Sequence, residues 1–374
     1  MSSRGIATAN THAADMTPDQ HERYDALIGA VTSQSDAFTK AGVPAERATG
    51  QAHHREDSDR PAGHPPGPAT DPARRRTIAR RPPSRDRAPT PEEHLMKLLI
   101  TGATGTVGGA LIQHLAGTRH HLRALVRNPA KAQLPDGVEI VQGDLTNPGD
   151  LRRALDGVDR AFLNMADDNG EHFAAVAGQL GLGHVVLLSS FTVTVPLPLG
   201  EDNVVTARHR AGEQALHAAG VPATLLRPAG FYTSLLAWTS ALADSVVGAP
   251  YLDVALPVVD PDDVAASAAA VLLADAPPAA AFSITGPKAL TVRDQTRILG
   301  EVLGRELRTE QITEQQAKDT ALPAGTPDRV AASILATASP AAAALPVSGD
   351  VQQLTGRGPR TFQRWTTEHA TAFG

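Results

Sequence analysis

The segment KLLITGATGTVG, residues 97–108, joins a short apolar strand to three glycines spaced three residues apart. The first glycine allows a sharp turn, the second lets the backbone approach a pyrophosphate with no Cβ in the way, and the third lets a helix lie close on the strand. Phosphate groups then meet the N–H groups at the N-terminus of that helix. The spacing therefore predicts a dinucleotide-binding turn. Its predicted cofactor-binding residues are Gly102, Thr104, Gly105, Thr106, Val107 and Gly108.

Arg127 ends the second expected strand, at the position where nicotinamide enzymes distinguish two cofactors. An acidic residue there accepts a hydrogen bond from a ribose 2′-hydroxyl, whereas an arginine pairs with a 2′-phosphate. Arg127 therefore favours NADPH over NADH, and a surface arginine at a strand end is the alternative. Asn164 follows the fourth strand, and we expect it to line the same cofactor channel because ligands bind at the carboxyl ends of parallel strands.

The motif T-G-A-T-G-x-x-G, residues 101–108, resembles that of the short-chain dehydrogenase/reductase superfamily. The resemblance implies an NAD(P) cofactor. It also implies that Asp144, followed by Leu145, contacts the adenine ring, and that Ser189 stands where the superfamily holds its substrate-polarising serine. Two plainer interpretations stay open, in which Asp144 caps the next helix and Ser189 forms a turn.

The stretch from residue 208 to residue 234 is more specific, because it resembles the atypical, NmrA-like branch of that superfamily. The branch carries a basic residue, a glutamate four residues later, a glycine helix end, a T-x-L-R-P strand end and an aromatic pair. Here these are His209, Glu213, Gly220, residues 224–228 and Phe231-Tyr232. With further matches downstream, the resemblance covers nearly all of residues 96–374.

Conventional members of the superfamily use a Tyr-x-x-x-Lys pair on this helix to exchange a proton with the substrate. If Glu213 fixes the alignment, the lysine position holds His209 and the tyrosine position holds Val205, which cannot move a proton. The predicted catalytic residues are therefore His209, as a general acid near neutral pH, and Tyr232, as an alternative proton donor. An i,i+4 pair between His209 and Glu213 is the plainer interpretation.

Three functions accommodate the lost proton relay. In the first, the protein is a flavin-free reductase that passes a hydride from NADPH to a quinone or activated enone, where solvent supplies the proton. In the second, it binds NAD(P) without turnover and reports redox state, as the NmrA regulators do. In the third, an arginine-rich N-terminal tail is the active part. The reductase of a small activated carbonyl compound is our prediction, and the redox sensor is its alternative.

Short apolar runs alternate with helical segments from Lys97 onward, which is typical of βαβ units. Strands are expected at residues 97–101, 122–127, 138–142, 159–164, 184–189 and 222–227. Helices are expected at residues 107–117, 148–156, 169–181 and 205–219. Further helix starts are indicated at Asp260-Pro261 and by the capping pair Thr291 and Asp294. The fold class is therefore α/β, a Rossmann-type doubly wound parallel sheet over residues 96–230, with a small C-terminal substrate-facing lobe from about residues 231–260 and 286–374.

Residues 1–95 differ in composition from the rest, since they hold 11 of the 29 prolines and 6 of the 14 histidines. They are predicted to be a disordered extension. Because Met96 directly precedes the first expected strand, two alternatives stay open: residues 1–95 are a natural extension, or the start of the protein has been assigned too early. Their run of arginines between residues 74 and 87 is interpreted as a solvated linker, because no aromatic residue interleaves it to stack on bases.

Charge and composition restrict the partners. Residues 1–95 carry 13 Lys and Arg against 13 Asp and Glu, so the net charge of −6 lies in residues 96–374. An acidic body argues against nucleic-acid binding. The chain has no cysteine, no apolar run of the ~20 residues that cross a bilayer, and no secretory signal. A cytoplasmic protein that acts on a small molecule, without a metal, is expected. The sequence does not indicate an oligomeric state.

Overall fold

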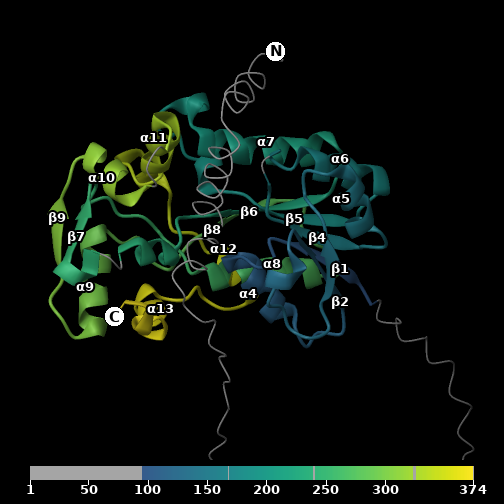
Figure 1. Ribbon diagram of the computed structural model, residues 1–374, viewed down its shortest axis with the longest axis horizontal. Helices are drawn as coiled ribbons and strands as arrows, with labels where there is room; N and C mark the ends of the chain where they lie inside the picture. Colours follow the sequence, from purple (N-terminus) through teal and green to yellow (C-terminus); the bar gives the residue numbers. More distant parts are fainter. Residues whose placement is uncertain (1–94, 167, 239–240, 323–325, 374) are drawn as a thin grey trace, which may run out of the picture. The chain divides into compact units, whose positions relative to one another are not determined.

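The computed structural model describes residues 95–166, 168–238, 241–322 and 326–373 (Figure 1). The predictions for the N-terminal extension and its arginines therefore lie outside the described residues. No helix in the described ranges is long and apolar enough to cross a membrane.

A seven-stranded sheet forms the centre of the described part of the chain. Its strands are β1 (Lys97–Thr101), β2 (His121–Val126), β3 (Glu139–Gln142), β4 (Arg160–Leu163), β5 (His184–Leu188), β6 (Ala223–Pro228) and β8 (Ala281–Ile284). They lie in the order β3-β2-β1-β4-β5-β6-β8, and every pair is parallel. The strand order reverses beside β1, which makes the crevice at the ends of β1 and β4 the expected ligand site of a doubly wound sheet. The predicted fold class is confirmed.

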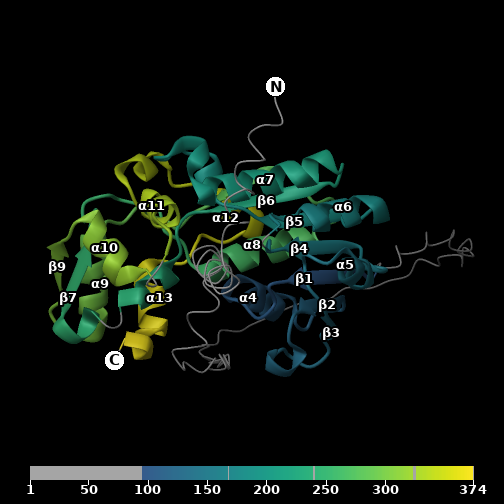
Figure 2. The same cartoon turned by 45° about the horizontal axis from the view of Figure 1, so that its top comes forward.

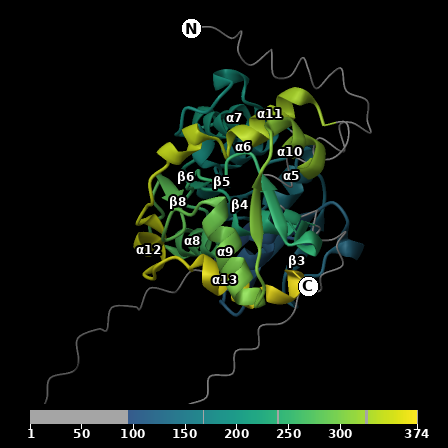
Figure 3. The same cartoon turned by 90° about the vertical axis from the view of Figure 1, so that its left-hand side faces the viewer.

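Helices cover both faces of the sheet (Figures 1 and 3). In the first half of the fold they are α4 (Thr106–Leu115), α5 (Pro148–Leu155), α6 (Glu171–Leu180), α7 (Val204–Ala218) and α8 (Pro261–Leu273). The later ones are α9 (Val292–Leu303), α10 (Glu314–Ala321), α11 (Asp328–Ala336), α12 (Asp350–Thr355) and α13 (Phe362–Glu368). The six strands and four helices predicted up to residue 228 are confirmed, with ends that shift by no more than two residues.

Side chains at the helix starts explain where the chain turns helical. Asn147 accepts hydrogen bonds from the N–H groups of Gly149 and Asp150 just before Pro148, and Asp260 accepts one from Asp262 just before Pro261. At the start of α9, Thr291 and Asp294 form the reciprocal capping box that the sequence predicts.

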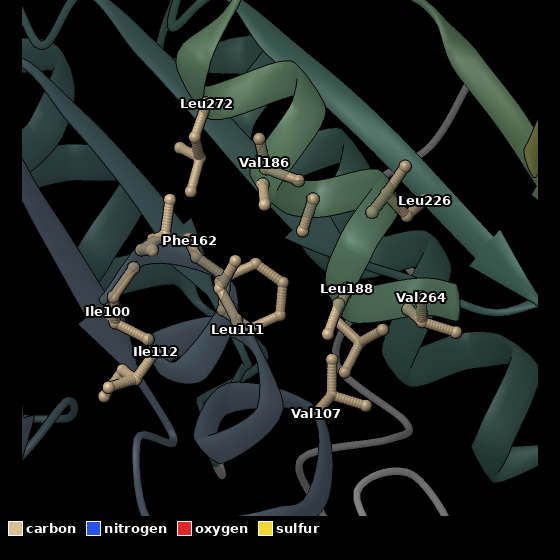
Figure 4. Close-up of a cluster of buried hydrophobic side chains, with 14 of the residues drawn as sticks. Ile100, Val107, Leu111, Ile112, Phe162, Val186, Leu188, Leu226, Val264 and Leu272 are labelled. Atoms are coloured by element: carbon tan, nitrogen blue, oxygen red, sulfur yellow. The ribbon is translucent and has the colours of Figure 1, made fainter. Parts of the chain in front are cut away.

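One apolar core holds the glycine turn in place. Figure 4 shows this core between the sheet and the helices α4 and α8, with Phe162 and Val186 of the sheet beneath Leu111, Ile112 and Leu272 of the helices. Leu111 and Ile112 are fully buried, and each such side chain contributes about 1.5–3 kcal/mol. A second core fills the opposite face, under α5, α6 and α7. The glycine turn therefore joins β1 and α4, and both of these elements are held in place by buried apolar side chains.

A smaller part of the fold follows β6 and lies away from β1 and β2 (Figures 1 and 2). It contains a parallel pair of strands, β7 (Val246–Ala249) and β9 (Arg308–Gln311), which the sequence pattern did not predict. Its core gathers Tyr232, Leu299, Phe362 and Trp365 from three segments that are far apart in the sequence.

Candidate functional site

The turn between β1 and α4 is a narrow cradle of backbone. Gly102 has φ +62°, in the left-handed region that favours glycine, and its carbonyl accepts a hydrogen bond of 2.9 Å from the N–H of Gly105. A Cβ on Gly108 would lie 2.1 Å from the carbonyl oxygen of Gly102, so α4 rests directly on the turn. Gly105 begins α4 without a side-chain cap, and the first turn of the helix carries no acidic residue. This end of α4 has the form of an anion site.

Asn164 lies against the turn from the end of β4. Its backbone is held by Thr101, whose hydroxyl accepts from the N–H of Asn164 at 2.8 Å and lies 3.2 Å from the carbonyl oxygens of Phe162 and Asn164. A Cβ on Gly102 would lie 2.7 Å from the amide nitrogen of Asn164. The structure therefore brings Asn164 to the glycine turn, as its place after β4 predicts.

The other three turn residues differ in what they present to a ligand. Thr104 is exposed and Thr106 is half-buried. The side chain of Val107 is 2% exposed and belongs to the apolar core, so Val107 offers only its backbone N–H.

Arg127 and Asp144 follow β2 and β3 at the same edge of the sheet. Arg127 is exposed, and its guanidinium makes no hydrogen bond or ion pair to any described residue. The carboxylate of Asp144 accepts two hydrogen bonds of 2.7 Å, from the N–H and the hydroxyl of Thr146. Asn147, not Asp144, caps α5. Leu145 is half-buried against the core beneath α5.

Ser189 belongs to a largely buried polar cluster that the sequence did not predict. It follows β5, and its hydroxyl donates to Oε1 of Glu213 at 2.6 Å. The same carboxylate accepts from Nε and Nη2 of Arg227, at 2.8 and 2.6 Å. We call Ser189, Glu213 and Arg227 the Glu213 cluster. Its hydrogen bonds raise the pKa of Arg227 above the ordinary value, so the guanidinium stays charged.

The surroundings of His209 do not support its predicted role as a general acid. The side chain is fully buried on α7, on the same face as Val205 and Leu216, and neither ring nitrogen has a hydrogen-bond partner among the described residues. Burial, followed by the charge of Arg208, lowers the pKa of His209 to about 3. The imidazole is therefore neutral at physiological pH. The predicted i,i+4 pair is wrong, because Glu213 binds Ser189 and Arg227 instead.

Tyr232 is likewise not placed to donate a proton to a substrate. It is 1% exposed, and its hydroxyl donates to the carbonyl of Arg360. Its ring lies edge-on to Phe362, with ring centres 5.1 Å apart, and beside Trp365. Burial raises the pKa of Tyr232 well above its ordinary value. Tyr232 is therefore part of the core under α13.

The burial of His209 makes folding stability depend on pH, which gives a first prediction. An unfolded histidine takes up a proton near pH 6.5, whereas folded His209 stays neutral to about pH 3. The free energy of unfolding should therefore fall as pH drops below 6.5, and His209→Leu should reduce that loss by about 1–2 kcal/mol at pH 5. Urea unfolding of the native protein and the variant at pH 7.5 and pH 5 measures the loss of stability in each. His217→Leu, at an exposed position of the same helix, is the control, and an equal change in both variants would contradict the assignment.

Comparison with known proteins adds evidence independent of this geometry. A family model described as NAD(P)H-binding matches residues 102–275. The chain is 40% identical over 283 residues to the (4-alkanoyl-5-oxo-2,5-dihydrofuran-3-yl)methyl phosphate reductase of Streptomyces griseus, which covers 74% of this chain and 99% of the relative. It is 30% identical over 291 residues to the NAD(P)H azoreductase of Xenophilus azovorans, again over 74% of this chain and 99% of the relative.

A solved structure is similar over the same region. The NADPH-dependent quinone oxidoreductase of Escherichia coli, crystallised with NADPH, superposes with a TM-score of 0.63 at 25% identity. The match covers 73% of this chain and 99% of that one. That structure therefore has an overall fold similar to that of the matched part of this chain.

Proposed function

The chain belongs to the NAD(P)H-binding family of reductases in the atypical short-chain dehydrogenase group, and from this we propose that it reduces a small activated carbonyl compound with NADPH. The observation that carries the proposal is the turn in which Gly102 touches Gly108. A phosphate needs backbone N–H groups with no side chain above them, and this turn supplies them. The residues present therefore fit a dinucleotide.

We assign the 2′-phosphate of NADPH to Arg127. Its side chain is exposed and has no partner within the described ranges, and it follows β2, where the adenosine ribose of a dinucleotide lies in a doubly wound sheet. Asp144 would stand at the adenine ring, with its carboxylate held by Thr146. Asn164 would meet the middle of the cofactor, because it already contacts Gly102.

A substitution at Arg127 tests this preference and is the second prediction. Arg127→Ala should weaken the binding of NADPH by about tenfold, because the charge-assisted pair between the guanidinium and the 2′-phosphate is lost. NADH affinity should stay unchanged, because NADH lacks the phosphate. Fluorescence titration with both nucleotides measures the two affinities. Arg152→Ala, at an exposed arginine on α5, is the control. Equal losses for NADPH and NADH would remove Arg127 from the site.

The cofactor, when bound, supplies the hydride. None of the three residues at the relay positions or proposed for them supplies an acid for the product. Val205 stands at the tyrosine position, His209 is neutral, and the hydroxyl of Tyr232 is bound to a carbonyl. The hydroxyl hydrogen of Ser189 is engaged in the hydrogen bond to Glu213, so Ser189 could present only an oxygen lone pair to a ligand.

This arrangement selects the substrate by chemistry. A simple ketone becomes a strongly basic alkoxide on hydride addition and needs an acid at once. A quinone or an enone becomes a delocalised anion that water protonates. We therefore propose a quinone, an unsaturated lactone or a similar conjugated acceptor. The relative from Streptomyces griseus supports this, since its name describes an unsaturated oxo-furan ring with an alkanoyl group.

A redox sensor that binds NADPH without turnover is the alternative, because the missing proton relay suits it equally. Purified protein with NADPH and a panel of quinones and unsaturated lactones, followed at the nicotinamide absorbance, separates the two. Turnover supports the reductase. Tight binding without turnover of any member of the panel would support the sensor.

A further inference from the structure

A hollow of about 640 Å³ lies between α9 and β9, in the smaller part of the fold. Its volume is within the ~300–1,000 Å³ of small-molecule sites. None of the residues that line it belongs to the glycine turn or to the strand ends around it. In Figure 1, α9 and β9 lie at the left end of the described part of the chain, whereas α4 lies near the centre and β1 to the right of it. The hollow is therefore separate from the dinucleotide site.

The lining of the hollow is basic in a chain whose net charge is −6. Four arginines and two glutamates face it, which gives a local charge of +2. The arginines are Arg293, Arg297, Arg305 and Arg308, and the glutamates are Glu301 and Glu306. Fixed guanidinium groups on opposite sides of a concave surface are the donors that pair with phosphate oxygens.

The arginines differ in how far they are already bound. Arg293 pairs with Asp253, Arg297 pairs with Glu301, and Arg305 donates to the carbonyl of Leu242. Arg308 is exposed, and its guanidinium has no partner among the described residues. Three arginines are thus oriented by other groups of the protein, and the guanidinium of Arg308 is available to pair with a ligand.

Thr296, which also lines the hollow, adds an independent observation. The hydroxyl of Thr296 is buried and has no hydrogen-bond partner among the described residues, although Thr296 is 2% exposed. A buried hydroxyl without a partner is uncommon in a folded protein. Beside it, a Cβ on Gly300 would lie 2.8 Å from the carbonyl oxygen of Arg305, so the glycine lets the loop close over the helix.

We propose that this hollow is a second anion site, which takes a small phosphorylated molecule and goes beyond the reductase function. A nucleic acid fits less well, because none of the described residues that line the hollow is aromatic and the body of the chain is acidic. The concave form and the four arginines suit a compact phosphate ester or diphosphate.

Calorimetric titration of the full chain with inorganic pyrophosphate, in saturating NADP⁺, tests the proposal. NADP⁺ occupies the glycine turn, so the remaining heat reports the second site. Pyrophosphate should bind at micromolar to millimolar concentration, about tenfold more weakly to Arg308→Gln, and not measurably to Arg308→Glu. Affinity for NADP⁺ should not change. Arg152→Gln, on α5, is the matched control.

Three results would overturn the proposal of a second anion site. If NADP⁺ abolishes the pyrophosphate heat, the anion uses only the glycine turn. If Arg308→Gln and Arg152→Gln bind alike, the hollow is not the site. If a short DNA duplex binds more tightly than pyrophosphate and Arg308→Glu abolishes that binding, the surface is one for nucleic acid. Each of these outcomes leaves the proposed reductase function unaffected.

Discussion

Gly108→Ala is expected to abolish NADPH binding at concentrations that saturate the native protein. The added Cβ would lie 2.1 Å from the carbonyl oxygen and 2.7 Å from the carbonyl carbon of Gly102, both backbone atoms. Helix α4 must then move off the turn, which separates the N–H groups that bind the pyrophosphate. We expect affinity to fall on the order of 100-fold, because several charge-assisted hydrogen bonds are lost together. Overpacking should also lower the free energy of unfolding by about 1–3 kcal/mol.

The neighbouring glycine provides the matched control. A Cβ on Gly109 would lie 3.5 Å from the carbonyl oxygen of Ala103, an ordinary contact. Gly109→Ala should therefore keep NADPH affinity and stabilise α4 by up to about 1 kcal/mol, through helix propensity. Fluorescence titration and urea unfolding of both variants measure the contrast. Native NADPH affinity in Gly108→Ala would show that the close contact of α4 with Gly102 is not what forms the cofactor site.

Glu213→Leu is expected to destabilise the protein by about 3 kcal/mol. The side chains of Glu213 and Arg227 are 11% and 20% exposed, so removal of the carboxylate leaves a largely buried guanidinium without its counter-charge. The hydroxyl of Ser189 loses its acceptor at the same time. Urea unfolding of the variant measures the loss.

Two comparisons distinguish this effect from a general sensitivity of the fold. The double variant Glu213→Leu with Arg227→Met should recover most of the loss, because an apolar pair replaces both charges. Glu301→Ala breaks the exposed pair with Arg297 and should cost less than about 1 kcal/mol. If the double variant is no more stable than Glu213→Leu, charge pairing is not the origin of the effect.

The sheet and the glycine turn were predictable because their signals are local. Alternation of apolar strands with helices defines βαβ units, and G-x-x-G-x-x-G fixes where β1 passes into α4. The ends of β2, β3 and β4 then place Arg127, Asp144 and Asn164 at one edge. Parallel pairing alone is enough for that inference, since it requires no knowledge of side-chain direction.

The surroundings of His209 and Tyr232 were not predicted, because burial and long-range packing decide them. His209 shares a helix face with Val205 and Leu216, and this spacing already indicated a buried position. For Tyr232, no local signal exists, because Phe362 and Trp365 cover it from α13. Motif positions show where a residue lies along the chain, and not what surrounds it.

The Glu213 cluster and the β7–β9 pair had no local signal either. Glu213 and Arg227 both stand in the motif of residues 208–234, but their contact depends on how α7 lies across β6. β7 and β9 are four residues each, and they pair across about sixty residues of chain. Arg308 to Gln311 of β9 are polar throughout, so no alternation marks them as a strand.

The most direct test of the central claim is the rate of NADPH oxidation with a matched pair of acceptors, an unsaturated lactone or quinone and the corresponding saturated ketone, in the same buffer. Since Val205, His209 and Tyr232 cannot protonate an alkoxide, we predict turnover of the conjugated acceptor and none of the saturated ketone. Equal turnover of both, or turnover of the ketone alone, would contradict the account, because either result requires a proton donor at the site.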